Sequence, residues 1–225
     1  MLNPLMLPLI ITALVVSQPQ DKAIRIKASL PAKAHCFICK QNGELELEKP
    51  AGGVSYKDKT YYFCNKSEIE SFLKDPDAFI PAPLPRTAAP FTLKTTTGTS
   101  ISLADMRGKL VLIDFWATWC VPCVKAMPGI QKLHTKYAPD GLAVIGISID
   151  DDAERKVPAF LKKSKQAITY PMLLDSGETW KQFGVKAIPS VMLVKDGEII
   201  EHWTGKIDMK AIELSIQQQI SKQKH

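Results

Sequence analysis

The chain has 225 residues, of which 45% are hydrophobic and 23% are charged, and its formal net charge is +6. This is the composition of a globular protein and excludes wholesale disorder. Lysines alternate with acidic residues and no basic cluster holds interleaved aromatic residues, so we expect no nucleic-acid partner. The five cysteines are too few for a disulfide-stapled scaffold of this length, and their odd number leaves at least one unpaired within the chain.

The first 17 residues have the character of an export segment. Residues 5–16 form an uncharged apolar run of 12 residues, shorter than the ~20 needed to span a bilayer. Val15 and Ser17 satisfy the small-residue rule for cleavage after Ser17, although no Lys or Arg precedes the run. We therefore predict that residues 1–17 are a signal peptide or, if uncleaved, a membrane anchor, and that the protein is periplasmic or otherwise extracytoplasmic.

A proline-rich stretch divides the rest of the chain. Residues 80–90 hold four prolines, at positions 81, 83, 85 and 90, and such a run favours extended polyproline conformation over a place in a sheet. It predicts a semi-rigid linker over residues 81–89, between a small module at residues 21–80 and a larger domain at residues 90–225.

Three cysteines lie in the small module. Cys36 and Cys39 have the spacing that brings two thiolates onto one metal ion, and Cys64 follows a predicted hairpin at Tyr56–Phe63. A module of this size buries little apolar surface and often needs a metal to stabilise it. The three thiols are therefore candidate metal ligands.

A helix is predicted after Cys64. Ser67 and Glu70 have the spacing of a capping box, with Ser67 as the N-cap residue, and Asp75-Pro76 should end the helix. Its apolar face would consist of Ile69, Phe72 and Leu73.

Residues 35–80 resemble the YHS domain, a small metal-associated α+β module, in the Tyr62-Phe63-Cys64 step and the helix that follows it. The resemblance implies a zinc or copper site formed by Cys36, Cys39 and Cys64, with His35 or Glu68 as a fourth ligand. The chain departs from the family at Glu68, where a further cysteine is common. Two alternatives remain open, namely a Cys36–Cys39 disulfide with a free Cys64, and an adaptor module that binds no metal.

The larger domain alternates strand and helix patterns. Leu110–Trp116 and Leu142–Ile149 are nearly continuous apolar runs, as expected of strands buried on both faces. Further patterns predict helices over residues 121–137, 152–165 and 209–219, and a hairpin of Ser190–Val194 and Glu198–His202 around Asp196-Gly197. This order predicts an α/β sandwich with a mixed sheet.

A Cys-x-x-Cys motif, Cys120-Val121-Pro122-Cys123, follows the first of these strands and opens a helix. The partial positive charge and free N–H groups of a helix N-terminus favour a thiolate on Cys120. Cys120 would attack a substrate disulfide, and Cys123, one turn further on, would resolve the mixed disulfide. Trp119 could cover the pair. A structural zinc site is not expected there, because the domain offers no second ligand pair.

Two residues outside the motif are further candidates. Asp114 lies within an apolar strand, where a carboxylate is costly to bury, and it could accept the proton of Cys123 through a water, as a general base for the resolving step. The alternative is a strand-edge carboxylate in solvent. Pro189 precedes a buried strand and could lie in a tight turn beside the cysteines, with the backbone of Ile188 pairing with the substrate. Alternatively, Pro189 merely begins the strand.

Residues 90–205 resemble the TlpA/ResA-like branch of the thioredoxin superfamily, which comprises periplasmic, membrane-tethered thiol–disulfide oxidoreductases. The matching residues are Pro90-Phe91-Thr92-Leu93, Leu103–Lys109, Trp116–Cys123, Met127-Pro128, Gly141-Leu142, Gly184-Val185 and Ile188-Pro189. The resemblance implies a thioredoxin fold, Pro189 as a cis-proline and reduction of disulfides in exported proteins. The chain departs from the branch at Ala126, where a Glu is common, and at Asp114, where an Asn is common.

The sequence therefore predicts an exported enzyme whose redox domain needs no cofactor. We expect Trp119, Val121, Pro122 and Ile188 to contact disulfide-bonded protein substrates, and an upstream membrane electron donor to re-reduce the cysteines. The alternative function is metal handling, in which the small module binds copper or zinc and the redox domain keeps the metal-site thiols reduced.

Overall fold

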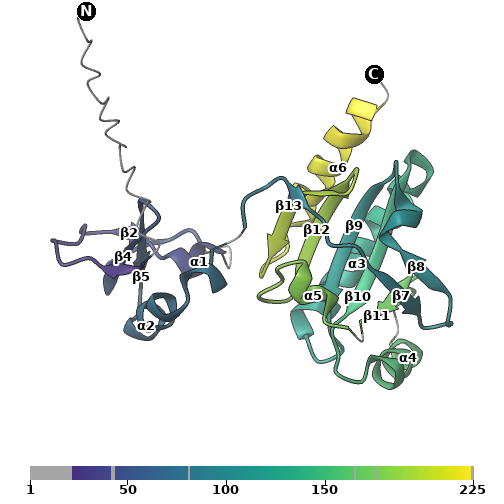
Figure 1. The fold of residues 1–225 in the computed structure, drawn as a ribbon, viewed down its shortest axis with the longest axis horizontal. Coiled ribbons are helices and arrows are strands. Elements are labelled where there is room, and N and C mark those ends of the chain that lie inside the picture. The colour runs from purple at the N-terminus through teal and green to yellow at the C-terminus, as the bar shows by residue number, and fades with distance from the viewer. Residues whose placement is uncertain (1–21, 42–43, 81, 165, 176, 224–225) are drawn as a thin grey trace, which may run out of the picture.

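The computed structural model describes residues 22–41, 44–80, 82–164, 166–175 and 177–223, which form a small module followed by a larger α/β body (Figure 1). The predicted export segment, residues 1–17, lies outside the described residues. None of the helices in the described residues combines the length and the apolar composition that a membrane span requires.

The small module is built on an antiparallel sheet of three strands in the order β1-β4-β5, beside a two-stranded ladder of β2 and β3. Its strands are β1 (Ile24–Arg25), β2 (Ala34–His35), β3 (Leu47–Glu48), β4 (Gly52–Tyr56) and β5 (Lys59–Phe63). Its helices are α1 (Phe37–Gln41), α2 (Lys66–Lys74) and the 3-10 turn η1 (Pro76–Ala78). The predicted hairpin is confirmed, and its first strand begins further upstream, at Gly52.

The core of the small module is aromatic. Val54, Phe63, Ile69 and Phe72 are fully buried, and Phe72 lies within 6.4 Å, between ring centroids, of five other aromatic rings. This cluster fixes α2 against the sheet, because the predicted apolar face of the helix is the face that it buries. Few aliphatic side chains contribute, so the module has a small apolar core for its length.

The predicted N-cap of α2 is wrong. Asn65, not Ser67, caps the helix, and its side-chain oxygen accepts a hydrogen bond from the N–H of Glu68 at 2.9 Å. Ser67 lies inside the first turn and donates its hydroxyl to Asn65 at 2.7 Å. Asn and Ser are comparable N-caps, and the sequence offers both, so pattern alone could not choose between them. The predicted end of the helix at Asp75 is confirmed.

The larger body contains one mixed sheet of eight strands in the order β6-β13-β12-β9-β10-β11-β7-β8. The strands are β6 (Arg86–Thr87), β7 (Thr92–Thr95), β8 (Ser100–Ser102), β9 (Leu110–Trp116), β10 (Leu142–Ser148), β11 (Met172–Leu174), β12 (Ser190–Lys195) and β13 (Glu198–Thr204). The neighbours β9, β10 and β11 pair in parallel, and all other pairs in this sheet are antiparallel. The predicted α/β sandwich with a mixed sheet is confirmed.

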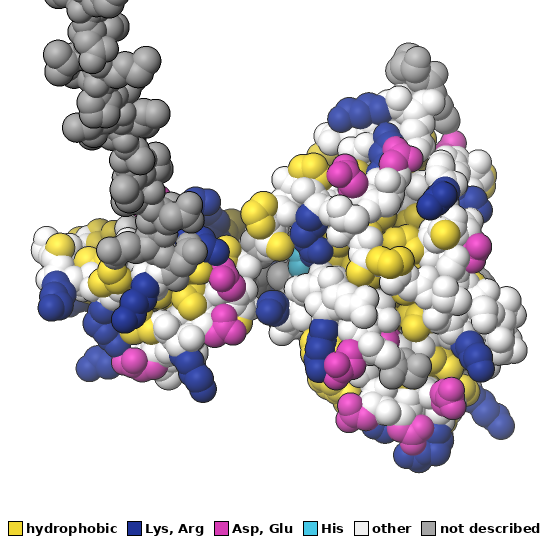
Figure 2. Space-filling model, viewed as in Figure 1, with side chains coloured by type: hydrophobic (Ala, Val, Ile, Leu, Met, Phe, Trp, Pro, Cys, Tyr) yellow, Lys and Arg dark blue, Asp and Glu magenta, His cyan; other side chains and the backbone are white. Residues whose placement is uncertain are grey.

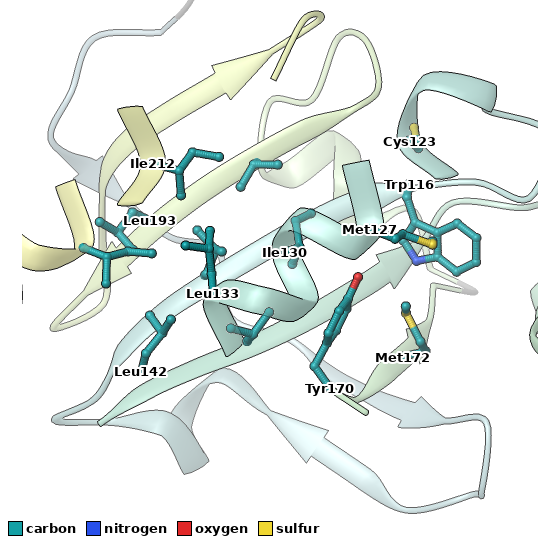
Figure 3. Close-up of a cluster of buried hydrophobic side chains, with 14 of the residues drawn as sticks. Trp116, Cys123, Met127, Ile130, Leu133, Leu142, Tyr170, Met172, Leu193 and Ile212 are labelled. Atoms are coloured by element: carbon teal, nitrogen blue, oxygen red, sulfur yellow. The ribbon is translucent and has the colours of Figure 1, made fainter. Parts of the chain in front are cut away.

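Helices cover this sheet, and two hydrophobic clusters lie on its opposite faces. The helical elements are η2 (Leu103–Met106), α3 (Val121–Tyr137), η3 (Ala138–Asp140), α4 (Ala153–Lys163), α5 (Thr179–Gln182) and α6 (Met209–Gln223). Helices α3, α4 and α6 bury their apolar sides in one cluster, which includes Trp116, Cys123 and Tyr170 (Figure 3). The other cluster gathers Phe91, Phe115 and Phe183 beneath the chain segments that precede β9 and β12.

The proline-rich stretch is not wholly a linker, which corrects the sequence prediction. Arg86 and Thr87 form β6, which pairs with β13 at the edge of the sheet, and the N–H of Ala88 donates to Gly197 at 2.8 Å. The prolines stand at positions 81, 83, 85 and 90, so residues 86–89 keep their N–H groups and can form a short edge strand. The described body therefore begins before the predicted boundary at residue 90.

Charged side chains of both signs are interspersed over the face drawn in Figure 2. That face carries no extended patch of a single sign on either the small module or the larger body.

Candidate active site

Cys120 and Cys123 lie where β9 gives way to α3. Cys120 is the N-cap residue of α3 and Cys123 lies in its first turn, and the two are joined by a disulfide with a Cα–Cα distance of 5.3 Å. Pro122 also lies in this first turn, where it costs the helix no hydrogen bond. The strand, the cap and the helix therefore place the two sulfurs at one end of the molecule's central strand.

The surroundings of Cys120 favour a thiolate once the disulfide is reduced. Its Sγ accepts a hydrogen bond from the N–H of Cys123 at 3.3 Å. The N-terminus of a 17-residue helix adds partial positive charge at the same point. Both effects stabilise the charged form of Cys120 and not that of Cys123, which is the environment that an attacking thiolate requires.

Apolar side chains surround this pair at the surface. Cys120 is 5% exposed and Cys123 is fully buried, whereas Trp119 and Val121 are 64% and 62% exposed. Pro122 is exposed and Ile188 is half-buried. The Trp119 ring is thus open to a partner instead of sealing the disulfide, and only the first sulfur is within reach of an incoming group.

Asp114 is fully buried in β9, on the face of the sheet that carries Cys123. Side chains alternate along a strand, so Asp114 faces the same way as Leu112 and Trp116, both of which pack in the α3 cluster with Cys123. Among the described residues, neither carboxylate oxygen has a hydrogen-bond partner. Burial raises the pKa of Asp114 to about 7, so the group can exchange a proton near neutral pH.

The strand beside Asp114 has a glycine at the paired position, and the side chains of Met172, Trp116 and Tyr170 fill the space that this leaves. Gly146 of β10 lies directly across from Asp114, and a Cβ there would meet Met172 Sδ at 2.5 Å, Trp116 Nε1 at 3.2 Å and Tyr170 at 3.3 Å. Within the described chain, the Tyr170 hydroxyl and Trp116 Nε1 are buried without a hydrogen-bond partner (Figure 3). Burial, followed by the charge of Asp114, raises the pKa of Tyr170, which keeps the phenol protonated and able to donate.

Pro189 follows a cis peptide bond, as the family resemblance implies. It ends the loop before β12, and its carbonyl accepts a hydrogen bond from the N–H of Gly205 at 3.1 Å. The next residue, Ser190, is buried and bonded to His202 Nε2 at 2.7 Å. Burial lowers the pKa of His202 to about 4, so the imidazole is neutral at pH 7. This pair secures the strand that carries Pro189.

Asp150 is a site residue that sequence reasoning missed. Its carboxylate is 2% exposed and accepts three hydrogen bonds, from Thr118 N at 2.9 Å, Thr118 Oγ1 at 2.7 Å and Ser148 Oγ at 2.9 Å. Thr118 lies in the loop that leads from β9 to Cys120. Asp150 therefore anchors the cysteine-bearing loop, and its place just after the predicted strand 142–149 was the signal that could have found it.

The three remaining cysteines come together in the small module, as predicted. The Sγ atoms of Cys36, Cys39 and Cys64 all lie within 4.8 Å of one another, and all three are free thiols. Glu68 Oε2 lies 3.7 Å from the sulfurs of Cys36 and Cys64 and accepts a hydrogen bond from each. His35 lies outside this cluster.

The environment of the cluster keeps the thiols of Cys39 and Cys64 protonated while no cation is near them. The hydrogen bond with Cys36, followed by burial, raises the pKa of Cys39, and burial raises that of Cys64. A cavity of about 330 Å³ opens beside Cys39 and is lined by Glu44, Glu46 and Glu48. Three carboxylates at the mouth of a thiol cluster attract cations.

Comparison with known proteins places the larger body among redox proteins. Residues 85–203 match the model of the AhpC/TSA family. The chain is 36% identical over 116 residues to the thioredoxin-like protein YneN of Bacillus subtilis, which covers 51% of this chain and 66% of that protein. It is 33% identical over 165 residues to the thiol–disulfide oxidoreductase ResA of Bacillus cereus, covering 72% of this chain and 86% of that protein.

The fold is shared with a solved structure described as the thiol:disulfide interchange protein DsbE of Chlorobium tepidum. The TM-score is 0.55 at 27% identity, covering 63% of this chain and 98% of that structure. Together with the family match, this likeness confirms the predicted thioredoxin fold of the larger body.

Replacing Asp114 by Asn should stabilise the fold, and more so in alkali. A carboxyl whose pKa is raised on folding does not lower the unfolding free energy through ionisation at pH values below its unfolded pKa of about 4, because it is protonated in both states. The cost grows with pH up to the folded pKa of about 7 and is constant above it. Urea unfolding should show a gain for Asp114→Asn that is larger at pH 8 than at pH 5 by on the order of 2 kcal/mol. Asp151→Asn, at the surface, is the control, and an equal gain at both pH values would contradict a buried charge.

Replacing Asp150 by Ala should loosen the loop before Cys120. The change leaves three donors without their buried acceptor, and loss of hydrogen bonds to a charged group should cost about 3 kcal/mol of unfolding free energy. Hydrogen exchange followed by mass spectrometry should show faster exchange in peptides covering residues 117–120. Exposed Asp151→Ala is the matched control. Unchanged exchange in the loop would show that Asp150 does not anchor it.

Proposed function

The chain belongs to the AhpC/TSA family and is a thioredoxin-fold thiol–disulfide oxidoreductase, and we propose that it reduces disulfides of proteins outside the cytoplasm. The observation that carries the proposal is the position of Cys120, which caps α3 among exposed apolar side chains, with its partner Cys123 buried behind it. The apolar, uncharged run of residues 5–16 supports export.

The reaction uses the two cysteines in sequence. The Cys120 thiolate attacks one sulfur of a substrate disulfide, which releases the other as a thiolate and leaves a mixed disulfide. Cys123 then attacks Cys120 Sγ, which forms the Cys120–Cys123 disulfide and releases the second substrate thiol. Two electrons pass to the substrate, and an upstream membrane electron donor must return the pair to its reduced state.

Asp114 serves the second step as a general base. Cys123 is fully buried and can attack only after losing its proton. Asp114 faces the same cluster, and burial brings its pKa to about 7, which suits proton transfer near neutral pH. Ionised Asp114 would take the proton of Cys123 and return it when the pair is next reduced.

The substrate docks on the apolar surface around the pair. Trp119 and Val121 offer exposed apolar area next to Cys120, and Pro122 lies in the same turn. Ile188, beside Pro189, offers backbone groups to an extended substrate chain. An apolar contact of this kind with backbone pairing gives little dependence on substrate sequence, as a general reductase requires.

The small module supplies a metal site in this proposal. In a tetrahedral zinc site with bonds of about 2.3 Å to sulfur and 2.1 Å to oxygen, neighbouring sulfurs are about 3.8 Å apart and a sulfur and an oxygen about 3.6 Å. The Cys39–Cys64 Sγ distance is 3.7 Å, and Glu68 Oε2 lies 3.7 Å from two of the sulfurs. The donor set of three thiolates and a carboxylate suits zinc, whereas copper(I) would use the thiolates alone.

Insulin-disulfide reduction by the full chain tests the redox function. Cys120→Ser should lower the rate to that of the dithiol reductant alone, because no other thiol in the chain precedes a helix as long as α3, and Cys36, which precedes α1, is followed by only five helical residues. Cys123→Ser should instead trap the mixed disulfide with the substrate, which mass spectrometry would identify. Turnover that survives in Cys120→Ser would contradict the mechanism.

Metal titration of the full chain in a Cys120→Ser/Cys123→Ser background tests the metal site. We expect one equivalent of Zn²⁺, with affinity lowered at least tenfold in Glu68→Gln because one ligand is lost. Glu70→Gln, exposed in the same helix, is the matched control. Binding of less than a tenth of an equivalent of either Zn²⁺ or Cu⁺ would rule out a metal site, and Cu⁺ binding indifferent to Glu68→Gln would identify copper.

A further inference from the structure

We infer that Cys39 and Cys64 form a second redox-active pair, whose disulfide is a substrate of the Cys120–Cys123 pair in the same chain. The inference rests on the proposed reductase function and adds to it a substrate carried by the protein itself. The site is the cluster of Cys36, Cys39 and Cys64, where the distances between the sulfur atoms allow thiol–disulfide exchange.

The geometry singles out one pair among the three thiols. Cys39 Sγ and Cys64 Sγ lie 3.7 Å apart and share a hydrogen bond, and a disulfide requires about 2.0 Å. Cys36 differs in burial, because it is only 4% exposed, whereas its hydrogen bond to Glu68 is shared by Cys64. Cys39 and Cys64 are half-buried, so an oxidant can reach them.

Access favours Cys39 as the sulfur that an incoming thiolate meets. The cavity of about 330 Å³ beside it gives an attacking group room to approach. Cys39 also lies in α1, a helix of five residues, and short helices yield easily to the side-chain and backbone movement that closing a disulfide needs.

The proposed exchange conserves electrons, protons and sulfur–sulfur bonds. An external protein disulfide or low-molecular-weight disulfide first takes two electrons and two protons from Cys39 and Cys64 and leaves as two thiols. The Cys120 thiolate then attacks the Cys39–Cys64 bond at Cys39 and releases Cys64. Attack by Cys123 on Cys120 releases Cys39, so the small module ends with two thiols and the redox pair ends as a disulfide.

The same event controls the proposed metal site. Oxidation of Cys39 and Cys64 removes two of the three thiolate ligands, so the oxidised module should not hold a metal ion. Reduction by the attached domain restores the ligands. Only residues 79–85 separate η1 from β6, and a covalent tether makes the meeting of the two pairs an event within one chain, with a higher effective concentration than that of separate chains.

The first experiment maps the disulfides. The metal-free wild-type chain is treated with diamide, alkylated in denaturant and analysed by peptide mass spectrometry. We expect a Cys39–Cys64 disulfide with Cys36 alkylated. In Cys123→Ser treated in the same way, we expect monomeric chain in which Cys120 is linked to Cys39. A Cys36–Cys39 disulfide, or a Cys120 linked only to a second copy of itself, would overturn the inference.

The second experiment separates exchange within the chain from exchange between chains. Reopening of the Cys39–Cys64 disulfide under limiting dithiothreitol is compared between the wild type and an equimolar mixture of Cys120→Ser/Cys123→Ser with Cys39→Ser/Cys64→Ser chains. At about 10 µM protein, the tether should make the wild type about 100-fold faster than the mixture. Equal rates would overturn the inference.

Insulin reduction by the same wild-type preparation is measured in parallel. If the wild type reduces insulin but its Cys39–Cys64 disulfide is reduced no faster than that of the mixture, the second redox pair is disproved and the proposed function is not. If the wild type does not reduce insulin, the proposed function and the inference fall together.

Discussion

Asp114 places a carboxylate in the middle of a strand that is buried along its whole length. An unpaired charge there would cost several kcal/mol, so burial favours the neutral carboxyl and raises its pKa to about 7. The neighbouring strand accommodates it with Gly146, and the phenol of Tyr170 lies over the same glycine. Burial alone thus raises the pKa of Asp114, and in the proposed mechanism the helix that packs on this face supplies the cysteine whose proton the carboxylate takes.

The two cysteines of the redox pair are distinguished by the same architecture. The end of β9 and the start of α3 put Cys120 at a point of positive potential near the surface and Cys123 one turn deeper, on the side of the base. Asp150 and Ser190 act at a distance, because one secures the loop before Cys120 and the other the strand after Pro189. The two cysteines and the loop that ends at Pro189, to which the proposed mechanism gives attack, resolution and docking, therefore keep their positions through the packing of three neighbouring strands of the sheet, β12, β9 and β10.

The elements predicted well are those with strong periodicity. The central strands, α3, the β12–β13 hairpin and α6 are long or bounded by Asp-Gly, so local pattern decides them. β7, β8 and β11 are three or four residues long and owe their place to pairing with neighbours, which no local pattern records. β6 was missed because prolines flank it, and Asp150 because its partner Thr118 is 32 residues away. The grouping of the cysteines into a pair and a cluster of three could be predicted from their spacing, whereas the position of Glu68 between two thiols required the fold.

The small module and the larger body are stabilised by different kinds of core. The larger one buries two apolar clusters on opposite faces of a sheet, whereas the smaller one relies on a few aromatic rings around Phe72. The three thiols and Glu68 lie beside that core, so a cation bound there would tie α1, the end of β5 and α2 together. A module stabilised in this way is sensitive to the oxidation state of its ligands, which gives a physical reason for attaching it to a disulfide reductase.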